Sequence, residues 1–240
     1  MTSSQPIKTL LFDLDGTLIK LDMDQFLPKY FKALGKHCAR NIDPKLLVEF
    51  ILKSIEAMIT SLDFTLTNQQ VFEQDFLIRS GLTADVVLPL FDSFYQEVFP
   101  SLAGQEVQNP AGIEAVKLAV NHGLEVVVAT NPVFPLTAIR QRLIWGGLQD
   151  IPFTLVTAYE NMHSCKPSLE YYREILTMLG RRPEECWMVG NDMAEDMVAG
   201  ELGLNTFLVE DYLIASSDQY TPTRIGRMTD LPKFVASLIS

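Results

Sequence analysis

The sequence predicts an α/β fold, in which a doubly wound parallel sheet carries helices on both faces and a helical unit is inserted after the first strand. An apolar run at residues 7–12 has the length and composition of a strand that is buried on both faces. The next eighty or so residues show only helical periodicity, and from residue 110 helical and strand-like segments alternate. Such alternation favours a parallel sheet with helices on both sides.

The inserted unit is predicted to hold four helices. Apolar stripes at helical spacing lie at residues 26–34, 46–59, 71–78 and 86–99, and the last is expected to break or bend near Pro89. Before the second stripe, Asp43 is a candidate N-cap and Pro44 fits the first helical turn. The chain would cross between the two units near residues 18–22 and 100–104. We therefore expect an α/β core at 1–20 and 104–240 and a helical domain at 21–103.

The second half supplies the rest of the predicted sheet and its helices. Strands are expected at 124–129, 153–156, 186–189 and 206–209. Helices are expected at 113–121, 136–145, 168–179, 195–203 and 231–239, with Ser168 as an N-cap and Gly180 as a stop. Between residue 211 and the last helix the pattern gives no assignment.

Composition narrows the class of protein. Among 240 residues, 48% are apolar, which is enough for a core, and the formal net charge of −11 argues against a broad basic face for nucleic acid. The three cysteines lie far apart with no metal-binding spacing, as expected for free thiols in a reducing compartment. No apolar run is long enough to span a bilayer, and the first residues do not resemble a targeting segment. We expect a cytoplasmic protein that binds neither nucleic acid nor membrane.

Two carboxylates follow the first strand directly. Residues i and i+2 of a strand point the same way, so Asp13 and Asp15 would converge where the chain leaves the sheet. Gly16 lets the backbone turn there, and Asp-x-Asp-Gly is also an ordinary turn sequence. Two carboxylates side by side repel each other unless a cation or a proton is shared between them. Oxygen ligands without a nearby His or Cys suit Mg²⁺.

Further polar residues follow two other predicted strands. Ligands of open α/β sheets bind outside the carboxyl ends of the strands, so these residues are expected to meet over one site. The set consists of Thr130, Asn131, Asn191 and Asp192, with Asp196 nearby and Lys166 on the preceding loop. A metal site, hydrogen-bond donors and a fixed cation are what phosphoryl transfer requires of a protein.

These stretches resemble the four motifs of the haloacid dehalogenase superfamily. In order they are DLDGT (residues 13–17), ATN (129–131), KPS (166–168) and GNDMAED (190–196). The resemblance implies a Rossmann-like core, and the helical insertion is similar to the α-helical cap of that superfamily. Such a cap would open and close over the site and select the substrate.

The resemblance also implies a role for each matching residue. Asp13 would be the nucleophile that forms an aspartyl-phosphate, and Asp15 would protonate the leaving oxygen and later deprotonate water. Thr130 and the backbone of Asn131 would hold the phosphoryl oxygens, and Lys166 would stabilise their negative charge.

For the metal, the resemblance implies that Mg²⁺ binds Asp13, the backbone carbonyl of Asp15, and a residue of the fourth motif. That motif usually reads Gly-Asp, whereas this chain reads Gly-Asn-Asp, so either Asn191 or Asp192 would occupy the ligand position. We favour Asp192, since a neutral amide is a weaker Mg²⁺ ligand. Asn191, Asp196 and Thr17 are then placed in supporting roles.

Asp15 reduces the number of reactions that the resemblance allows. Dehalogenases and phosphonatases of the superfamily lack an acid two residues after the nucleophile, whereas phosphatases and phosphomutases have one. We expect a magnesium-dependent phosphatase acting on a small phosphorylated metabolite, as a monomer or a homodimer. The alternatives are a sugar phosphomutase, which would need a cap that excludes water, and a catalytically silent binding or regulatory member. The Asn191 departure is the only support for the silent alternative.

Overall fold

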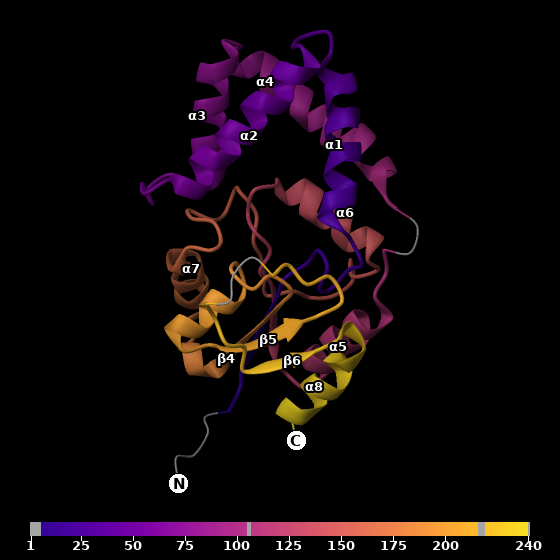
Figure 1. Ribbon diagram of the computed structural model, residues 1–240, viewed down its shortest axis with the longest axis vertical. Helices are drawn as coiled ribbons and strands as arrows, with labels where there is room; N and C mark the ends of the chain where they lie inside the picture. Colours follow the sequence, from indigo (N-terminus) through magenta and orange to yellow (C-terminus); the bar gives the residue numbers. More distant parts are fainter. Residues whose placement is uncertain (1–5, 105–106, 216–218, 240) are drawn as a thin grey trace.

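The computed structural model describes residues 6–104, 107–215 and 219–239, and Figure 1 shows its architecture. Its strands are β1 (Thr9–Phe12), β2 (Glu125–Val128), β3 (Leu155–Val156), β4 (Cys186–Gly190), β5 (Asn205–Val209) and β6 (Arg224–Gly226). Its helices are α1 (Met23–Cys38), α2 (Pro44–Thr60), α3 (Asn68–Ser80), α4 (Ala84–Ser93), α5 (Pro110–Asn121), α6 (Leu136–Trp145), α7 (Leu169–Leu179) and α8 (Leu231–Leu238). None of the helices in these ranges is long and apolar enough to cross a membrane.

The six strands form one sheet in the order β3-β2-β1-β4-β5-β6, and all neighbouring pairs are parallel. This confirms the predicted α/β fold. The register aligns Phe12 at the end of β1 with Val128 of β2 and Val189 of β4. The residues that follow these three strands therefore emerge side by side at one edge of the sheet.

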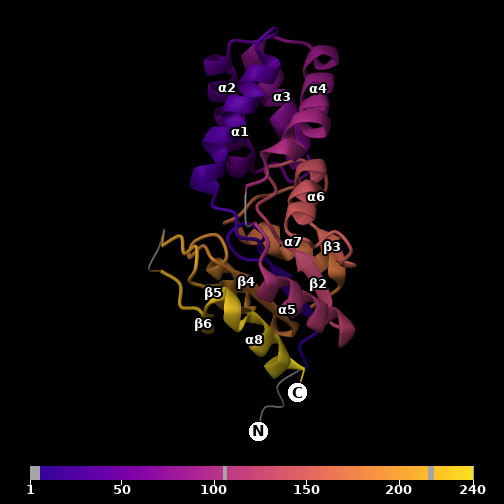
Figure 2. The same ribbon diagram turned by 90° about the vertical axis from the view of Figure 1, so that its right-hand side faces the viewer.

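Both faces of β1 are buried, as its apolar run predicts. Leu10 and Phe12 pack in the core cluster that includes residues of α5 and α8, whereas Leu11 packs in a second cluster with residues of α7. Figure 2 shows α5 and α8 on one side of the sheet and α7 on the other. Each large side chain buried in this way contributes about 1.5–3 kcal/mol through the apolar area that it removes from water.

Helices α1 to α4 form a separate helical unit at one end of the molecule (Figure 1). Side-chain caps mark where two of these helices begin. The Asp43 carboxylate accepts hydrogen bonds from the amides of Lys45 and Leu46, which confirms the predicted N-cap of α2. Thr67 and Gln70 form a capping box at the start of α3.

The helical unit also contacts the core through the first residue of α3. Asn68 is completely buried, and its Nδ2 donates hydrogen bonds to the carbonyl oxygens of Pro132 at 3.3 Å and Ser164 at 3.2 Å. Its backbone amide donates to the carbonyl of Met162 at 2.8 Å. The start of α3 is thus tied to two loops at the edge of the sheet.

Two sequence expectations are wrong in detail, and one segment without an assignment proves to contain a strand. The predicted break near Pro89 does not occur, since α4 continues through this proline to Ser93 and gives way at Phe94 to a π-helical turn, Phe94–Val98. The predicted helix at 195–203 is a 3-10 turn, Met197–Leu202, because Gly200 weakens a helix here and Gly203, with φ of 94°, ends it. The segment that had no assignment contributes the edge strand β6.

Candidate active site

The turn after β1 places the first two carboxylates. The Asp13 amide still donates to the carbonyl of Val189 at 2.8 Å, so Asp13 continues the line of the strand. Gly16 then adopts φ of 78°, and a Cβ atom at this position would lie 2.7 Å from Asn191 Nδ2. Both the backbone angle and the close approach therefore require glycine.

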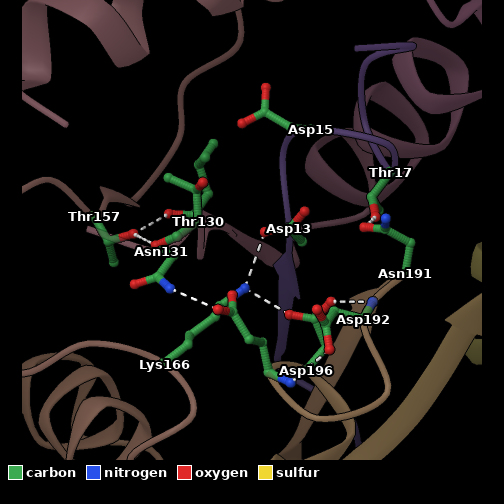
Figure 3. Close-up of polar contacts among 12 residues, drawn as sticks. Asp13, Asp15, Thr17, Thr130, Asn131, Thr157, Lys166, Asn191, Asp192 and Asp196 are labelled. Carbon is green, nitrogen blue, oxygen red and sulfur yellow. Dashed lines mark hydrogen bonds and ion pairs between the residues drawn. The ribbon is translucent and has the colours of Figure 1, made fainter. Parts of the chain in front are cut away.

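Lys166 bridges two acidic residues in the interior. Its Nζ lies 2.9 Å from Asp13 Oδ1 and 2.6 Å from Asp196 Oδ1 (Figure 3), and only 1% of the residue is exposed. Burial alone would lower the pKa of Lys166, but the two carboxylates raise it well above its usual range. The lysine therefore remains a fixed positive charge beside Asp13.

Asp196 connects this ion pair to the loop after β4. Its Oδ1 receives the Lys166 hydrogen bond, and its Oδ2 accepts one from the Asp192 amide at 2.9 Å. A Cβ at position 190 would lie 2.0 Å from Asp196 Oδ2, so only Gly190 leaves room for this carboxylate. Burial raises the pKa of Asp196 to about 6, although the Lys166 ammonium opposes the shift.

The loop after β2 is held by a buried hydrogen-bond network. The hydroxyl groups of Thr157 and Tyr171 donate to the Thr130 carbonyl at 2.8 and 2.9 Å. Asn131 Nδ2 donates to Glu195 Oε1 at 2.9 Å, whereas Asn131 Oδ1 is buried without a hydrogen-bond partner. Burial raises the pKa of Glu195 to about 7. Glu195 is not among the predicted site residues, because one more acidic residue beside Asp196 gives no separate signal in the sequence.

Asp15 pairs with a second cation, Arg142, which is also not among the predicted site residues. Arg142 of α6 is 1% exposed, and its Nη1 donates to Asp15 Oδ2. The guanidinium also lies over the ring of Phe134, 4.6 Å from the ring centre. Burial raises the pKa of Asp15, and Arg142 partly offsets this effect. The signal in the sequence is that Arg142 follows Ala138 by four residues and therefore lies on the buried face of its helix.

Asn191 and Asp192 have different surroundings. The Asn191 side chain accepts from Thr17 Oγ1 at 3.0 Å and donates to the Tyr212 carbonyl at 2.7 Å (Figure 3 shows the Thr17 contact). Asp192 Oδ1 accepts from the amides of Ala194 and Glu195 at 2.7 and 2.9 Å. The Asn191 amide thus links two segments of the chain, whereas Asp192 brings a carboxylate to the edge of the site.

These side chains surround one cavity of about 200 Å³ at the carboxyl edge of the sheet. All predicted residues except Lys166 and Thr17 line it, and those two contact the lining residues Asp13 and Asn191. The lining side chains with polar or charged groups are those of Asp13, Asp15, Thr130, Asn131, Arg142, Asn191, Asp192, Glu195 and Asp196. The three motifs that follow β1, β2 and β4 therefore meet at one place with the Lys166 loop, as the sequence predicts.

The donor set of this cavity fits a hard divalent cation. Its carboxylates outnumber its cationic groups, which among the described residues are Arg142 and the adjoining Lys166, and no His or Cys lines it. Within those same ranges, no three His, Cys, Asp or Glu side chains form a metal cluster by themselves. A metal would therefore need backbone oxygen atoms in addition to carboxylates, which is a ligand set that Mg²⁺ accepts.

Comparisons with known proteins agree with this geometry. The family model of haloacid dehalogenase-like hydrolases matches residues 7–202, which is well over half of the chain. No curated protein matches the sequence.

Solved structures of the same fold include phosphatases and dehalogenases. A HAD phosphatase from Thermococcus onnurineus is 21% identical with a TM-score of 0.59, and the alignment covers 95% of this chain and 98% of that one. A predicted phosphoglycolate phosphatase from Haemophilus somnus 129pt is 17% identical (TM-score 0.58; 95% and 97% covered). The L-2-haloacid dehalogenase from Xanthobacter autotrophicus is 14% identical (TM-score 0.57; 96% and 98% covered). At these identities the likeness concerns the fold alone.

Proposed function

The chain belongs to the haloacid dehalogenase-like hydrolase family, and we propose that this hydrolase is a magnesium-dependent phosphatase of a small phosphomonoester. One observation carries the proposal. Asp13 and Asp15 line the same cavity, and each carboxylate has its own buried cation, Lys166 for Asp13 and Arg142 for Asp15. Two carboxylates held apart in this way can perform two different tasks on one substrate.

In the first half of the proposed reaction, a carboxylate oxygen of Asp13 attacks phosphorus and forms an aspartyl-phosphate. The bond between phosphorus and the leaving oxygen breaks, and the Asp15 carboxyl group donates its proton to that oxygen. The Asp15 carboxylate lies apart from the group formed by Asp13, Lys166 and Asp196 (Figure 3), as expected for an acid that faces the leaving group.

In the second half, water attacks the phosphorus of the aspartyl-phosphate while the Asp15 carboxylate removes a proton from it. The bond between Asp13 and phosphorus breaks, which releases inorganic phosphate and restores the Asp13 carboxylate. Lys166 offsets the negative charge on the phosphoryl group throughout, and Thr130 and the Asn131 backbone orient its oxygen atoms. The network of Thr157 and Tyr171 keeps the Thr130 backbone in place.

Magnesium would be held by the Asp13 carboxylate, the backbone carbonyl of Asp15 and the Asp192 carboxylate. When bound, it would neutralise charge on the phosphoryl oxygens and on the crowded carboxylates. We assign Asn191 a structural role instead, since both ends of its side-chain amide already serve Thr17 and Tyr212. We further propose that the helical unit, residues 21–103, acts as a cap over the site.

The other candidate functions have less support. A dehalogenase has no leaving oxygen to protonate, so it would have no use for the acid Asp15. A sugar phosphomutase needs a cationic site for a second phosphate. Among the described residues that line the cavity, Arg142 is the only cation, and it already pairs with Asp15. A silent binding protein would not require the buried Lys166 bridge.

The test is hydrolysis of an aryl phosphate with Mg²⁺ and with EDTA, using the Asp13→Asn variant as the control. We expect turnover that requires Mg²⁺ and is lost in the variant. No turnover by wild-type protein whose circular dichroism shows a folded chain would contradict the proposal. Turnover that persists in Asp13→Asn would contradict the covalent mechanism.

A further inference from the structure

A second cavity lies beside the active site, between the helical unit and the loop after β2. This apolar chamber has a volume of about 230 Å³, and its wall includes Leu27, Leu34, Ile51, Ile55, Phe72 and Phe91. Of the described residues that line it, only Tyr30, Tyr95 and Tyr159 carry an oxygen or nitrogen atom in the side chain, and none carries a formal charge. Tyr30 and Tyr95 already share a hydrogen bond of 2.8 Å between their hydroxyl groups.

The apolar chamber adjoins the catalytic cavity directly. Met23, Val133 and Phe134 line both cavities. Phe134 also carries the Arg142 guanidinium on its ring, and Arg142 in turn pairs with Asp15. Asp15, the proposed acid for the leaving oxygen, is therefore connected to the chamber wall through a single cation and a single aromatic ring.

This arrangement bears on where the leaving group of the proposed reaction would lie. In the proposed reaction the leaving oxygen lies between phosphorus and Asp15, and the rest of the leaving group extends away from Asp13. From Asp15, the shared wall at Phe134 leads into the apolar chamber.

We propose that the apolar chamber binds the leaving group of the substrate, and that this group is a hydrocarbon, either an aromatic ring or an alkyl chain. The proposal rests on the proposed phosphatase function and adds the substrate class. A cavity of about 150 Å³ with comparable walls is large enough to bind benzene, so the chamber has room for such a group. Sugar hydroxyl groups would lose their water there and find few partners, which makes their binding unfavourable.

The first experiment compares kcat/KM for methyl, butyl and benzyl phosphate with glycerol 3-phosphate and glucose 6-phosphate. Each buried methylene is expected to raise kcat/KM about three- to fourfold along the alkyl series. Benzyl phosphate should exceed both polar phosphates by about ten- to hundredfold, which corresponds to full burial of one aromatic side group.

The second experiment fills the apolar chamber. In Ile55→Trp, the added volume should reduce the ratio of kcat/KM for benzyl phosphate to that for methyl phosphate about tenfold or more. Ile59→Trp is the matched control, because it lies one turn later on α2 with 40% of its surface exposed and does not line the chamber. It should keep the wild-type ratio. A reduced ratio of benzyl to methyl phosphate turnover in both variants, or in neither, would overturn the proposal.

The experiments distinguish failure of the chamber proposal from failure of the proposed phosphatase function. Turnover without preference for the apolar esters, or with preference for the sugar phosphate, would overturn the chamber proposal and leave the phosphatase intact. If no ester is hydrolysed, calorimetry with benzylphosphonate and methylphosphonate tests the chamber by itself. Tighter binding of benzylphosphonate that is lost in Ile55→Trp would support the chamber, and equal binding of the two would overturn it.

Discussion

Arg142 and Asp15 form an ion pair in the protein interior, although they are 127 positions apart in the sequence. Asp15 comes from the turn after β1, and Arg142 comes from the buried face of α6. The two carboxylates of the turn therefore have different cationic partners, because Asp13, two residues earlier, pairs with Lys166 instead. It also connects the catalytic turn to the helix that follows the Thr130 loop.

Removing this arginine should destabilise the fold. In Arg142→Met, Asp15 would be buried without a cation, and loss of one partner of a buried pair costs about 3–5 kcal/mol. The free energy of unfolding in urea measures this cost. Arg140→Met, an exposed arginine on the same helix, should change it by less than about 0.5 kcal/mol. The double variant Asp15→Asn/Arg142→Met should regain part of the lost stability, and a purely additive result would contradict the pairing.

Lys166→Met should remove most of the catalytic activity from a folded protein. Without the ammonium group, the phosphoryl group beside Asp13 loses the one side-chain cation that we assign to it, and loss of such a stabilising contact typically lowers kcat about 10²- to 10³-fold. Steady-state hydrolysis of an aryl phosphate gives the comparison, with the exposed Lys45→Met as the control. A Lys166→Met enzyme with wild-type kcat would be incompatible with the role that we assign to this residue.

Substitutions of Asp192 and of Asn191 should have different effects on the Mg²⁺ concentration that the enzyme needs. Asp192→Asn keeps an acceptor for the amides of Ala194 and Glu195 but loses the carboxylate charge. We expect the Mg²⁺ concentration for half-maximal activity to rise about tenfold or more. Asn191→Ala should leave this concentration unchanged while lowering the free energy of unfolding by about 1–3 kcal/mol, since the Thr17 hydroxyl and the Tyr212 carbonyl lose their partner. The opposite pattern would make Asn191 the ligand.

Glu185 should make the free energy of unfolding decrease as the pH falls below about 4.5. Lys8 binds its carboxylate at 2.7 Å and the Arg182 amide binds it at 3.0 Å, and these contacts lower the pKa of Glu185 from 4.5 to about 2. A depressed pKa stabilises the folded state above the unfolded value, and this contribution disappears as pH falls from 4.5 to about 2.

The Glu185→Gln variant tests this contribution. It should be less stable than wild type at pH 7 and should lose less stability between pH 5 and pH 2, as measured by urea midpoints. Its neighbour Glu184 is exposed, so Glu184→Gln should follow the wild-type curve. Parallel curves for wild type and Glu185→Gln would show that the contacts of Glu185 do not contribute.

The sequence predicted those parts of the site that follow strands. Asp13, Thr130 and Asp192 come at the ends of apolar runs, and a parallel register brings such ends together. Arg142 could not be found in this way, because a helix delivers it and an arginine in a helix is most often solvated. Its partner becomes apparent only when α6 packs beside the turn after β1.

The elements that the sequence did not predict also have physical reasons. The edge strand β6 has only three residues with one apolar side chain, Ile225, and that side chain is 58% exposed, so neither periodicity nor burial marks it. At Phe94 the helix widens without a proline or glycine, among several aromatic rings that pack against one another. Tertiary packing of this kind overrides a local pattern.

The hydrogen bonds of Asn68 have a consequence for any movement of the helical unit. Its side chain also donates to Cys165 Sγ at 3.3 Å, and Cys165 immediately precedes Lys166 in the chain. A displacement of α3 away from the sheet must therefore either break these buried contacts or carry the Lys166 loop with it. If the helical unit acts as the cap proposed above, its opening would disturb the loop that positions Lys166 through this one buried amide.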